Sequence, residues 1–249
     1  MKKVLRISGV ILLALILIST LGFVIWASTP AEPQPEAFQS LSDTPDVSFE
    51  TINDWLVYQP TGTDPGAGLI LYPGGRVDYR AYGPHARAIA AGGYQVVVVP
   101  MPLNFAFLGI NRAAQVIAAY PDIAYWAVGG HSLGGAMAAE FVKDNASLVD
   151  GLVLWASYPA ESTDLSAFEI EVVSIYASND GLATPDDVLS AQPRLPTGAQ
   201  FVEIAGGNHA GFGWYGPQNG DGPLEIPKLE QQAQVVDATL ALLSSLEEK

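Results

Sequence analysis

The runs VVVV (96–99) and LVLW (152–155) are apolar at every position, and this feature constrains the fold more than any other. A strand with one face in water alternates apolar and polar residues, so an unbroken apolar strand is buried on both faces. Strands of this kind occur in parallel sheets that helices cover on each side. The sequence therefore predicts an α/β fold with a mostly parallel sheet.

Strands and helical stretches alternate along most of the chain. An antiparallel hairpin is expected over about residues 47–60, with its turn at Asn53-Asp54. We expect strands at 67–75, 94–102, 124–132, 151–159, 171–180 and 200–209, and helices at 79–92, 110–120, 133–146, 184–191 and 227–246. Right-handed crossovers then produce an open sheet, and ligands bind beyond the carboxyl ends of its strands.

Residues 7–26 form an uncharged, mostly apolar run at the N-terminus. As a helix this run would span about 30 Å, the thickness of the hydrocarbon core of a bilayer. Lys2, Lys3 and Arg6 precede it and predict a cytoplasmic n-region at residues 1–6. The run therefore predicts a single-pass transmembrane helix in the cell membrane, with the rest of the chain outside the cytoplasm.

A cleaved signal peptide is the alternative, with a cut near residues 27–29 and a secreted product. The apolar run is longer than the usual h-region of about 7–15 residues, and no clean small-x-small site follows it, which favours the anchor. Residues 27–45 are rich in proline and predict an extended spacer. We expect the folded domain at residues 46–249.

Charge and composition exclude several classes of function. The chain has 11 Lys and Arg against 26 Asp and Glu, a formal net charge of −15. So acidic a surface repels nucleic acid, and no nucleic-acid partner is expected. Cysteine is absent and there are only three histidines, so we expect neither a metal nor a cofactor. The oligomeric state is left open.

The motif Gly-His-Ser-Leu-Gly-Gly at 130–135 joins a buried strand to a helix of small residues. A sharp strand-to-helix turn of the G-x-S-x-G type raises a serine hydroxyl above the sheet, and the flanking glycines prevent clashes between strand and helix. The N–H groups at the start of the helix can also face a developing negative charge. Ser132 is the predicted nucleophile.

A serine hydroxyl needs an adjacent base, which is usually histidine. His209 follows the last expected strand, where a loop can bring it to Ser132, whereas His85 is interpreted as a half-exposed helix residue. Asp180 ends the strand before that of His209 and can orient the imidazole. Asp186 and Asp187 are interpreted as helix-start residues.

Two fixed N–H donors are expected to bind the oxyanion. One is Leu133, and the other is Gly75 or Arg76 in the loop after the first parallel strand. Arg76, Tyr79, Phe105 and Trp155 are candidates for the substrate pocket, as bulky side chains near strand ends. Only AESTDLSAFE (160–169) links the strand at 151–159 to the strand that ends at Asp180, so no large lid domain is expected and the pocket should be open.

The segments YPGG (72–75), GHSLGG (130–135), Asn179-Asp180 and GGNHAGFGWYGPQNGDG (206–222) resemble the α/β-hydrolase superfamily over roughly residues 48–247. The closer resemblance is to small bacterial dienelactone-hydrolase-like esterases. It implies a triad of Ser132, Asp180 and His209, with Leu133 and Gly75 in the oxyanion hole. Dienelactone hydrolases proper carry a cysteine at the position of Ser132, so their lactone substrate is not transferred.

These observations predict a membrane-anchored, extracytoplasmic serine hydrolase that cleaves a small-molecule carboxylic ester through an acyl-enzyme intermediate. Amidase, thioesterase and acyltransferase chemistry uses the same groups and stays open. A catalytically idle binding module is a rival from another class, because a fold alone does not imply activity. Scaffolding of a partner at the membrane by the anchor and spacer is a third possibility.

Overall fold

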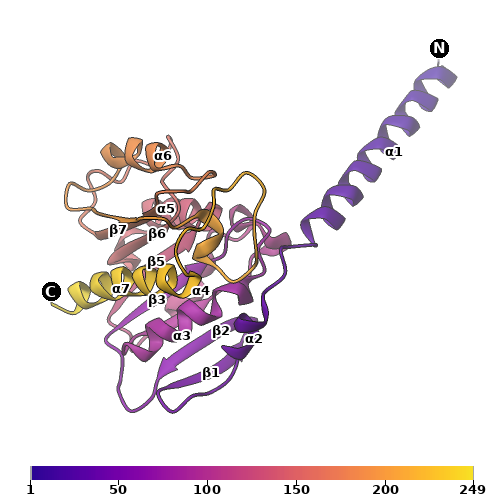
Figure 1. Cartoon of the computed structure of the whole chain (residues 1–249). Coiled ribbons are helices and arrows are strands. Elements are labelled where there is room, and N and C mark those ends of the chain that lie inside the picture. The colour runs from indigo at the N-terminus through magenta and orange to yellow at the C-terminus, as the bar shows by residue number, and fades with distance from the viewer. Residues whose placement is uncertain (1, 249) are drawn as a thin grey trace.

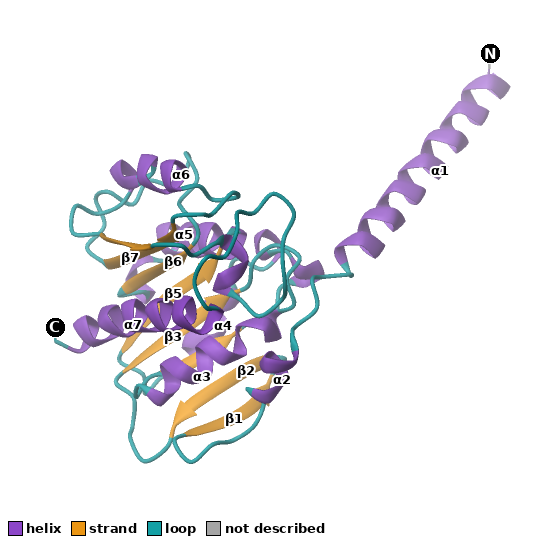
Figure 2. Cartoon of the chain, in the orientation of Figure 1, coloured by secondary structure: helices purple, strands orange, loops and turns teal. Residues whose placement is uncertain are grey.

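The computed structural model of the chain describes the backbone of residues 2–248, without the side chains of residues 2–7 and 10. Across these residues an eight-stranded sheet has the order β1-β2-β4-β3-β5-β6-β7-β8 (Figures 1 and 2). Its strands are β1 (Val47–Ile52), β2 (Trp55–Pro60), β3 (Ala67–Tyr72), β4 (Gln95–Val98), β5 (Tyr125–His131), β6 (Gly151–Trp155), β7 (Glu171–Ala177) and β8 (Gln200–Ile204). β2 pairs antiparallel with β1 and with β4, and every other pair of neighbouring strands is parallel. The predicted mostly parallel α/β sheet is confirmed.

Helices cover both faces of the sheet. Leu69 and Leu71 of β3 pack in one core with α3 (Gly83–Ala91) and α7 (Lys228–Glu247), while Ile70 and Tyr72 pack in a second core with α4 (Arg112–Ala119) and α5 (Leu133–Asp144). Successive residues of a strand point to opposite faces, so an apolar run supplies both cores at once. This explains why the central strands show no polar alternation.

The expected helices are present, with shorter bounds. The stretch predicted at 79–92 divides into a 3₁₀ turn at Tyr79–Tyr82 and α3, whose first turn contains a proline. α6 (Pro185–Ser190) begins with a capping box between Thr184 and Asp187, which confirms the interpretation of Asp187 as a helix-start residue. The described connection between β6 and β7 contains no helix or strand, in agreement with the absence of a lid domain.

α1 (Lys2–Ala27) extends away from the rest of the molecule (Figure 1). Within the described residues, no helix is both long enough and apolar enough to cross a bilayer, so the structure does not support the predicted transmembrane helix at 7–26. The side chains of the predicted n-region, residues 1–6, lie outside the described residues, as do those of Ile7 and Val10.

The predicted extended spacer at 27–45 is wrong, because this segment packs along the domain. Ala31 forms a parallel bridge with Val77, and the N–H of Gln34 donates to the carbonyl oxygen of Trp214 at 2.7 Å. A short helix, α2 (Pro35–Gln39), follows, and its Ala37 is fully buried. The bridge and the hydrogen bond join residues far apart in the chain, which the proline-rich composition alone does not indicate.

The interpretation of His85 as a half-exposed residue is also wrong. Its side chain is fully buried on α3, and its ring packs against Trp155 with 5.3 Å between ring centroids. Neither ring nitrogen has a hydrogen-bond partner among the described residues. Burial, with a smaller contribution from the charge of Lys228, lowers the pKa of His85 to about 3.

This burial predicts an acid-sensitive component of stability that His85→Leu removes. Between about pH 6.5 and pH 3 the unfolded chain protonates this residue and the folded chain does not, so the free energy of unfolding falls as the pH falls, by about 1.4 kcal/mol per pH unit. Urea unfolding measured between about pH 6.5 and 4.5 gives the free energy of unfolding of both proteins. As the pH falls, this free energy should decrease less steeply in His85→Leu than in the parent chain, by about 1.4 kcal/mol per pH unit. Parallel profiles of the two proteins would contradict a buried neutral His85.

Candidate active site

Ser132 lies in the tight turn between β5 and α5, with φ of 53° and ψ of −124°. A positive φ at a non-glycine residue costs on the order of 1–3 kcal/mol and concentrates at functional sites. The N–H of Ser132 donates to the carbonyl oxygen of Trp155 at 2.9 Å, and the Ser157 hydroxyl donates to the carbonyl oxygen of Ser132 at 2.6 Å. These bonds to the end of β6 hold the strained turn in place.

The glycines of the motif allow three backbones to meet at this turn. A Cβ on Gly130 would lie 2.5 Å from the carbonyl carbon of Gly134 and 2.7 Å from the carbonyl oxygen of Tyr72. A Cβ on Gly134 would overlap the carbonyl oxygens of Tyr72 and Pro73. Any side chain at either position would therefore separate α5 from the ends of β3 and β5.

Asp180 and His209 form a buried hydrogen-bonded pair. His209 Nδ1 lies 2.8 Å from Asp180 Oδ2. Both residues are buried, with His209 1% exposed and Asp180 3% exposed. Asp180 Oδ1 accepts the N–H groups of Leu182 and Ala183, each at 2.8 Å. A carboxylate that accepts Nδ1–H leaves Nε2 as the basic nitrogen of the imidazole.

His131 places this pair beside the serine. The rings of His131 and His209 have centroids 4.4 Å apart, and His131 directly precedes Ser132. Tyr82 accepts the N–H of Gly74 at 2.9 Å and lies 2.8 Å from His131 Nδ1, so its hydroxyl proton is available to that nitrogen. Within the described residues no hydrogen bond joins Ser132 and His209; such bonds are often long until substrate is present.

Among the described residues, the backbone N–H groups of Leu133 and Gly75, both near Ser132, have no hydrogen-bond partner. The two residues are neighbours, since a Cβ on Gly75 would lie 3.1 Å from Leu133 Cδ2. The N–H of Arg76 instead donates to the carbonyl oxygen of Asn104 at 2.8 Å. Of the two sequence-based choices, Gly75 rather than Arg76 therefore has a free donor.

A cavity of about 290 Å³ is lined by Ser132 and Leu133, by Ala136 of α5, and by residues of the segments that follow β6 and β7. Larger hollows elsewhere, such as one of about 630 Å³ beside residues 28–33, contain neither Ser132 nor His209. Among the described residues, no group of three or more His, Asp or Glu side chains is placed to hold a metal ion.

None of the four side chains predicted to line a pocket lines this cavity. The prediction is wrong for Trp155, which is fully buried and donates its ring N–H to Thr239 at 3.1 Å. Tyr79 belongs to the 3₁₀ turn before α3. Strand ends carry both core and pocket residues, so large size alone does not distinguish the two.

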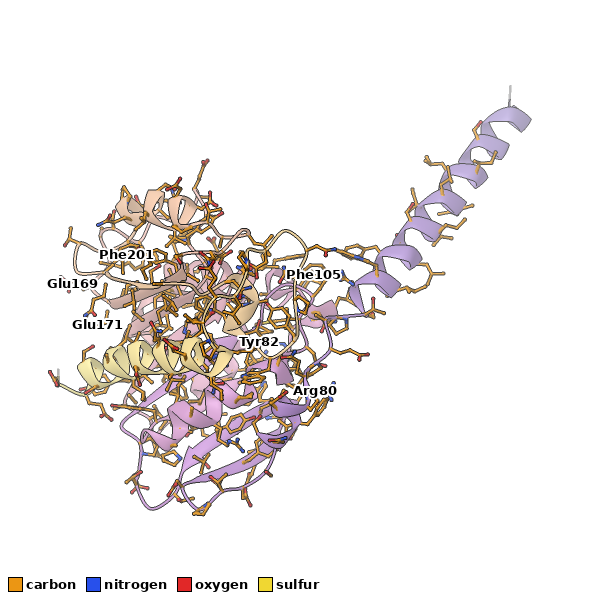
Figure 3. The ribbon with its side chains drawn as sticks, viewed as in Figure 1. Arg80, Tyr82, Phe105, Glu169, Glu171 and Phe201 are labelled. Carbon is orange, nitrogen blue, oxygen red and sulfur yellow. The ribbon has the colours of Figure 1, made fainter. Side chains whose placement is uncertain are left out.

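Arg76 and Phe105 contact the end of α1 instead of the cavity. The Arg76 guanidinium lies over the Trp26 ring at 4.1 Å and donates to the carbonyl oxygens of Trp26 and Thr29. Phe105 stacks on Phe23 with 6.1 Å between ring centroids, and Figure 3 places it where α1 meets the domain. The two residues thus join the N-terminal helix to the loop that contains Gly75.

Asp221 is a site residue that the sequence analysis missed. Its Oδ1 accepts the N–H of His209 at 3.0 Å and its Oδ2 accepts that of Ala210 at 2.8 Å. Oδ1 also lies 3.4 Å from the N–H of Gly181, the residue after Asp180. One carboxylate therefore holds the backbones that carry both members of the Asp180–His209 pair. The unusual glycine-rich stretch at 206–222 was the available signal, but it did not show which backbone the carboxylate contacts.

Gln231 of α7 holds the same loop from the other side. Its side chain is fully buried and contacts the backbone of Asn208 twice, accepting its N–H at 3.1 Å and donating to its carbonyl oxygen at 2.8 Å. A buried glutamine in a helix gives no signal in the sequence that separates it from a surface residue. Its contact connects the position of His209 to the packing of the last helix.

The sequence matches the model of a known protein family over most of the folded domain. The model of the alpha/beta hydrolase family matches residues 68–233. No protein of curated function matches the sequence at a significant level. The matched range includes Ser132, Asp180 and His209.

Several solved structures share the fold at low sequence identity. A predicted CIB-like hydrolase from Thermoplasma acidophilum is 18% identical with a TM-score of 0.56, covering 79% of this chain and 98% of its own. Est1E from Butyrivibrio proteoclasticus, solved with ferulic acid, is 10% identical with a TM-score of 0.59, covering 82% and 98%. The esterase domain of a Rhodothermus marinus protein is 12% identical with a TM-score of 0.55, covering 78% and 95%. At these identities the likeness concerns the fold.

The contacts of Asp221 predict a loss of stability on truncation. Asp221→Ala leaves the N–H groups of His209 and Ala210 without acceptors, and we expect the free energy of unfolding to fall by about 1–3 kcal/mol. Asp64→Ala, which removes the same charge from an exposed loop, should change it by less than about 0.5 kcal/mol. Equal urea midpoints for the two variants would show that Asp221 does not hold the loop.

Proposed function

The chain belongs to the alpha/beta hydrolase family, and from this we propose that it is a serine hydrolase that cleaves carboxylic esters through an acyl-enzyme intermediate. The observation that carries the proposal is the buried Asp180–His209 pair beside the strained turn at Ser132. A fold alone does not imply activity, so the proposal depends on these three residues. A structural neighbour that is described as an esterase domain, from a Rhodothermus marinus protein, is consistent with it.

In the proposed reaction, Ser132 Oγ attacks the ester carbonyl carbon while His209 Nε2 accepts the hydroxyl proton. The resulting imidazolium is stabilised by Asp180, which accepts Nδ1–H at 2.8 Å. His209 then donates the proton to the leaving alcohol oxygen, and the acyl group stays on Ser132. Water, deprotonated by His209, releases the acid and restores the serine.

The free N–H groups of Leu133 and Gly75 supply the proposed oxyanion hole. The first residue of α5 has no acceptor within its own helix, so its N–H is available without reorganisation. Such preorganised donors stabilise the negative charge that develops on the carbonyl oxygen, and the loss of one typically costs about 10²–10³ in kcat. The contacts of Arg76 with Asn104 and with the end of α1 hold the loop that presents Gly75.

We also propose that the N-terminal segment places the domain outside the cytoplasm, either as a membrane anchor or as a cleaved signal peptide. The support is the uncharged run at 7–26 in the sequence and the exposure of apolar side chains along α1, where the successive residues Ile11, Leu12 and Leu13 point in different directions and are each more than half exposed. A helix with apolar side chains on every side is stable when these side chains are buried, in a protein core or in a membrane, and not when they face water. The proposal concerns location only, and the chemistry above does not depend on it.

Reaction of the purified full chain with a fluorophosphonate probe tests the proposed nucleophile and base. We expect a single phosphonylated peptide containing Ser132, none in Ser132→Ala, and a fall in labelling rate and in hydrolysis of p-nitrophenyl butyrate on the order of 10⁴-fold in His209→Ala and Asp180→Asn. His85→Leu is the matched histidine control and should keep both activities. A folded parent chain that is not labelled would exclude an activated serine.

Expression of the full chain in bacteria with a C-terminal tag tests the proposed location. A tag that external protease removes from spheroplasts, on a chain of full mass in the membrane fraction, would support the anchor; a chain shortened by residues 1 to about 29 would support the signal peptide. The matched control begins at Ser28 and should stay in the cytoplasm, because it keeps the docked segment around α2 and lacks α1. Full-mass chain recovered in the cytoplasm would overturn the proposal.

A further inference from the structure

The cavity at Ser132 has small apolar walls. Ala136 comes from α5, Ala156 and Ala160 follow β6, and Leu182 and Ala183 follow β7. Its volume of about 290 Å³ lies just below the range of about 300–1,000 Å³ that is usual for ligand pockets. Ser157 and Tyr158 complete the lining, and at roughly 30 Å³ for each methylene-sized group the volume leaves room for about ten carbon atoms.

No lysine, arginine or histidine side chain is among the residues that line the cavity. Burial raises the pKa of Tyr158 in its wall, and the charge of Asp187 adds to this effect while Arg194 opposes it. Arg194 donates to the carbonyl oxygen of Pro159 and does not itself line the cavity. A carboxylate that enters the cavity would therefore lose hydration without gaining a paired cation, which is unfavourable.

His209 does not line the cavity either, and this decides which part of an ester fits there. The leaving oxygen must receive its proton from the base, so it lies on the side of His209. The other substituent of the carbonyl carbon, the acyl chain, is then directed into the cavity that begins at Ser132 and Leu133. This assignment rests on the proposed function.

We propose that the cavity is the acyl-binding site and that it accepts short, uncharged acyl groups and excludes acyl groups that carry a carboxylate. Its size limits the length of the acyl chain, and the absence of a lining cation sets its charge preference. The acidic surface, with a net charge of −15, acts in the same direction by repelling anionic substrates. Neutral esters of short acids are thus the substrate class.

Hydrolysis of matched esters tests this proposal. We expect kcat/KM for p-nitrophenyl butyrate to exceed that for p-nitrophenyl hemisuccinate, which adds a terminal carboxylate, by at least about tenfold. In a series from acetate to palmitate, kcat/KM should fall by about tenfold or more once the acyl chain exceeds roughly ten carbons, the length at which it no longer fits the cavity. A hemisuccinate that reacts as well as butyrate, or a maximum at palmitate, would overturn the proposal.

Ala160→Lys gives a sharper test, because Ala160 is exposed at the rim of the cavity. The added cation should raise the ratio of kcat/KM for hemisuccinate to kcat/KM for butyrate several-fold, and added salt should reduce the gain. Ala91→Lys is the matched control; it adds the same charge at the end of α3, away from the cavity lining, and should leave the ratio unchanged. An equal ratio in both variants would contradict a charge preference set by this cavity.

Failure of this proposal can be distinguished from failure of the proposed function. If Ser132 reacts with the fluorophosphonate probe but the ester series shows no preference for short neutral acyl groups, the enzyme assignment stands and the cavity is not the acyl site. If neither ester is hydrolysed and no probe reacts, the proposed function fails and the acyl site fails with it.

Discussion

The absence of side chains at Gly130 and Gly134 is the constraint on which the site depends. It allows the start of α5 to approach the ends of β3 and β5 so closely that a Cβ at Gly130 would lie 2.5 Å from a backbone atom of α5. Only this close approach forces Ser132 into the left-handed region while leaving its side chain at the head of the helix. The same approach makes Leu133 and Gly75 neighbours, and the N–H group of each is without a partner among the described residues.

The Asp180–His209 pair depends on a second constraint, a loop that is held by side chains from outside itself. Asp221 accepts the N–H groups of His209 and Ala210, and Gln231 accepts the N–H group of Asn208, the residue before His209. Buried polar groups are costly unless they are paired, so these contacts restrict the loop to one arrangement. A base that is placed in advance avoids reorganisation during the reaction, which is where much of the catalytic effect of such sites arises.

The N-terminal segment contributes to the same region. Residues 31–40 pack along the domain, and the end of α1 contacts the loop of Gly75 through Arg76 and Phe105. A segment that looks like a detachable spacer by composition is therefore structurally continuous with the candidate oxyanion loop. Changes in α1 and changes near Ser132 are expected to influence each other through these contacts.

The linear sequence determined the strands, their order along the chain and the turn at Ser132, because each of these depends on residues within a few positions of one another. The apolar runs required burial on both faces, and the spacing of glycines around Ser132 required a close strand–helix turn. Tertiary structure alone decided the burial of His85 and Trp155, the docking of residues 31–40, the choice of Gly75 over Arg76, and the role of Asp221. These outcomes depend on contacts between residues 11 or more positions apart. Such contacts depend on how the elements pack in space, and no local pattern of residue types records that packing.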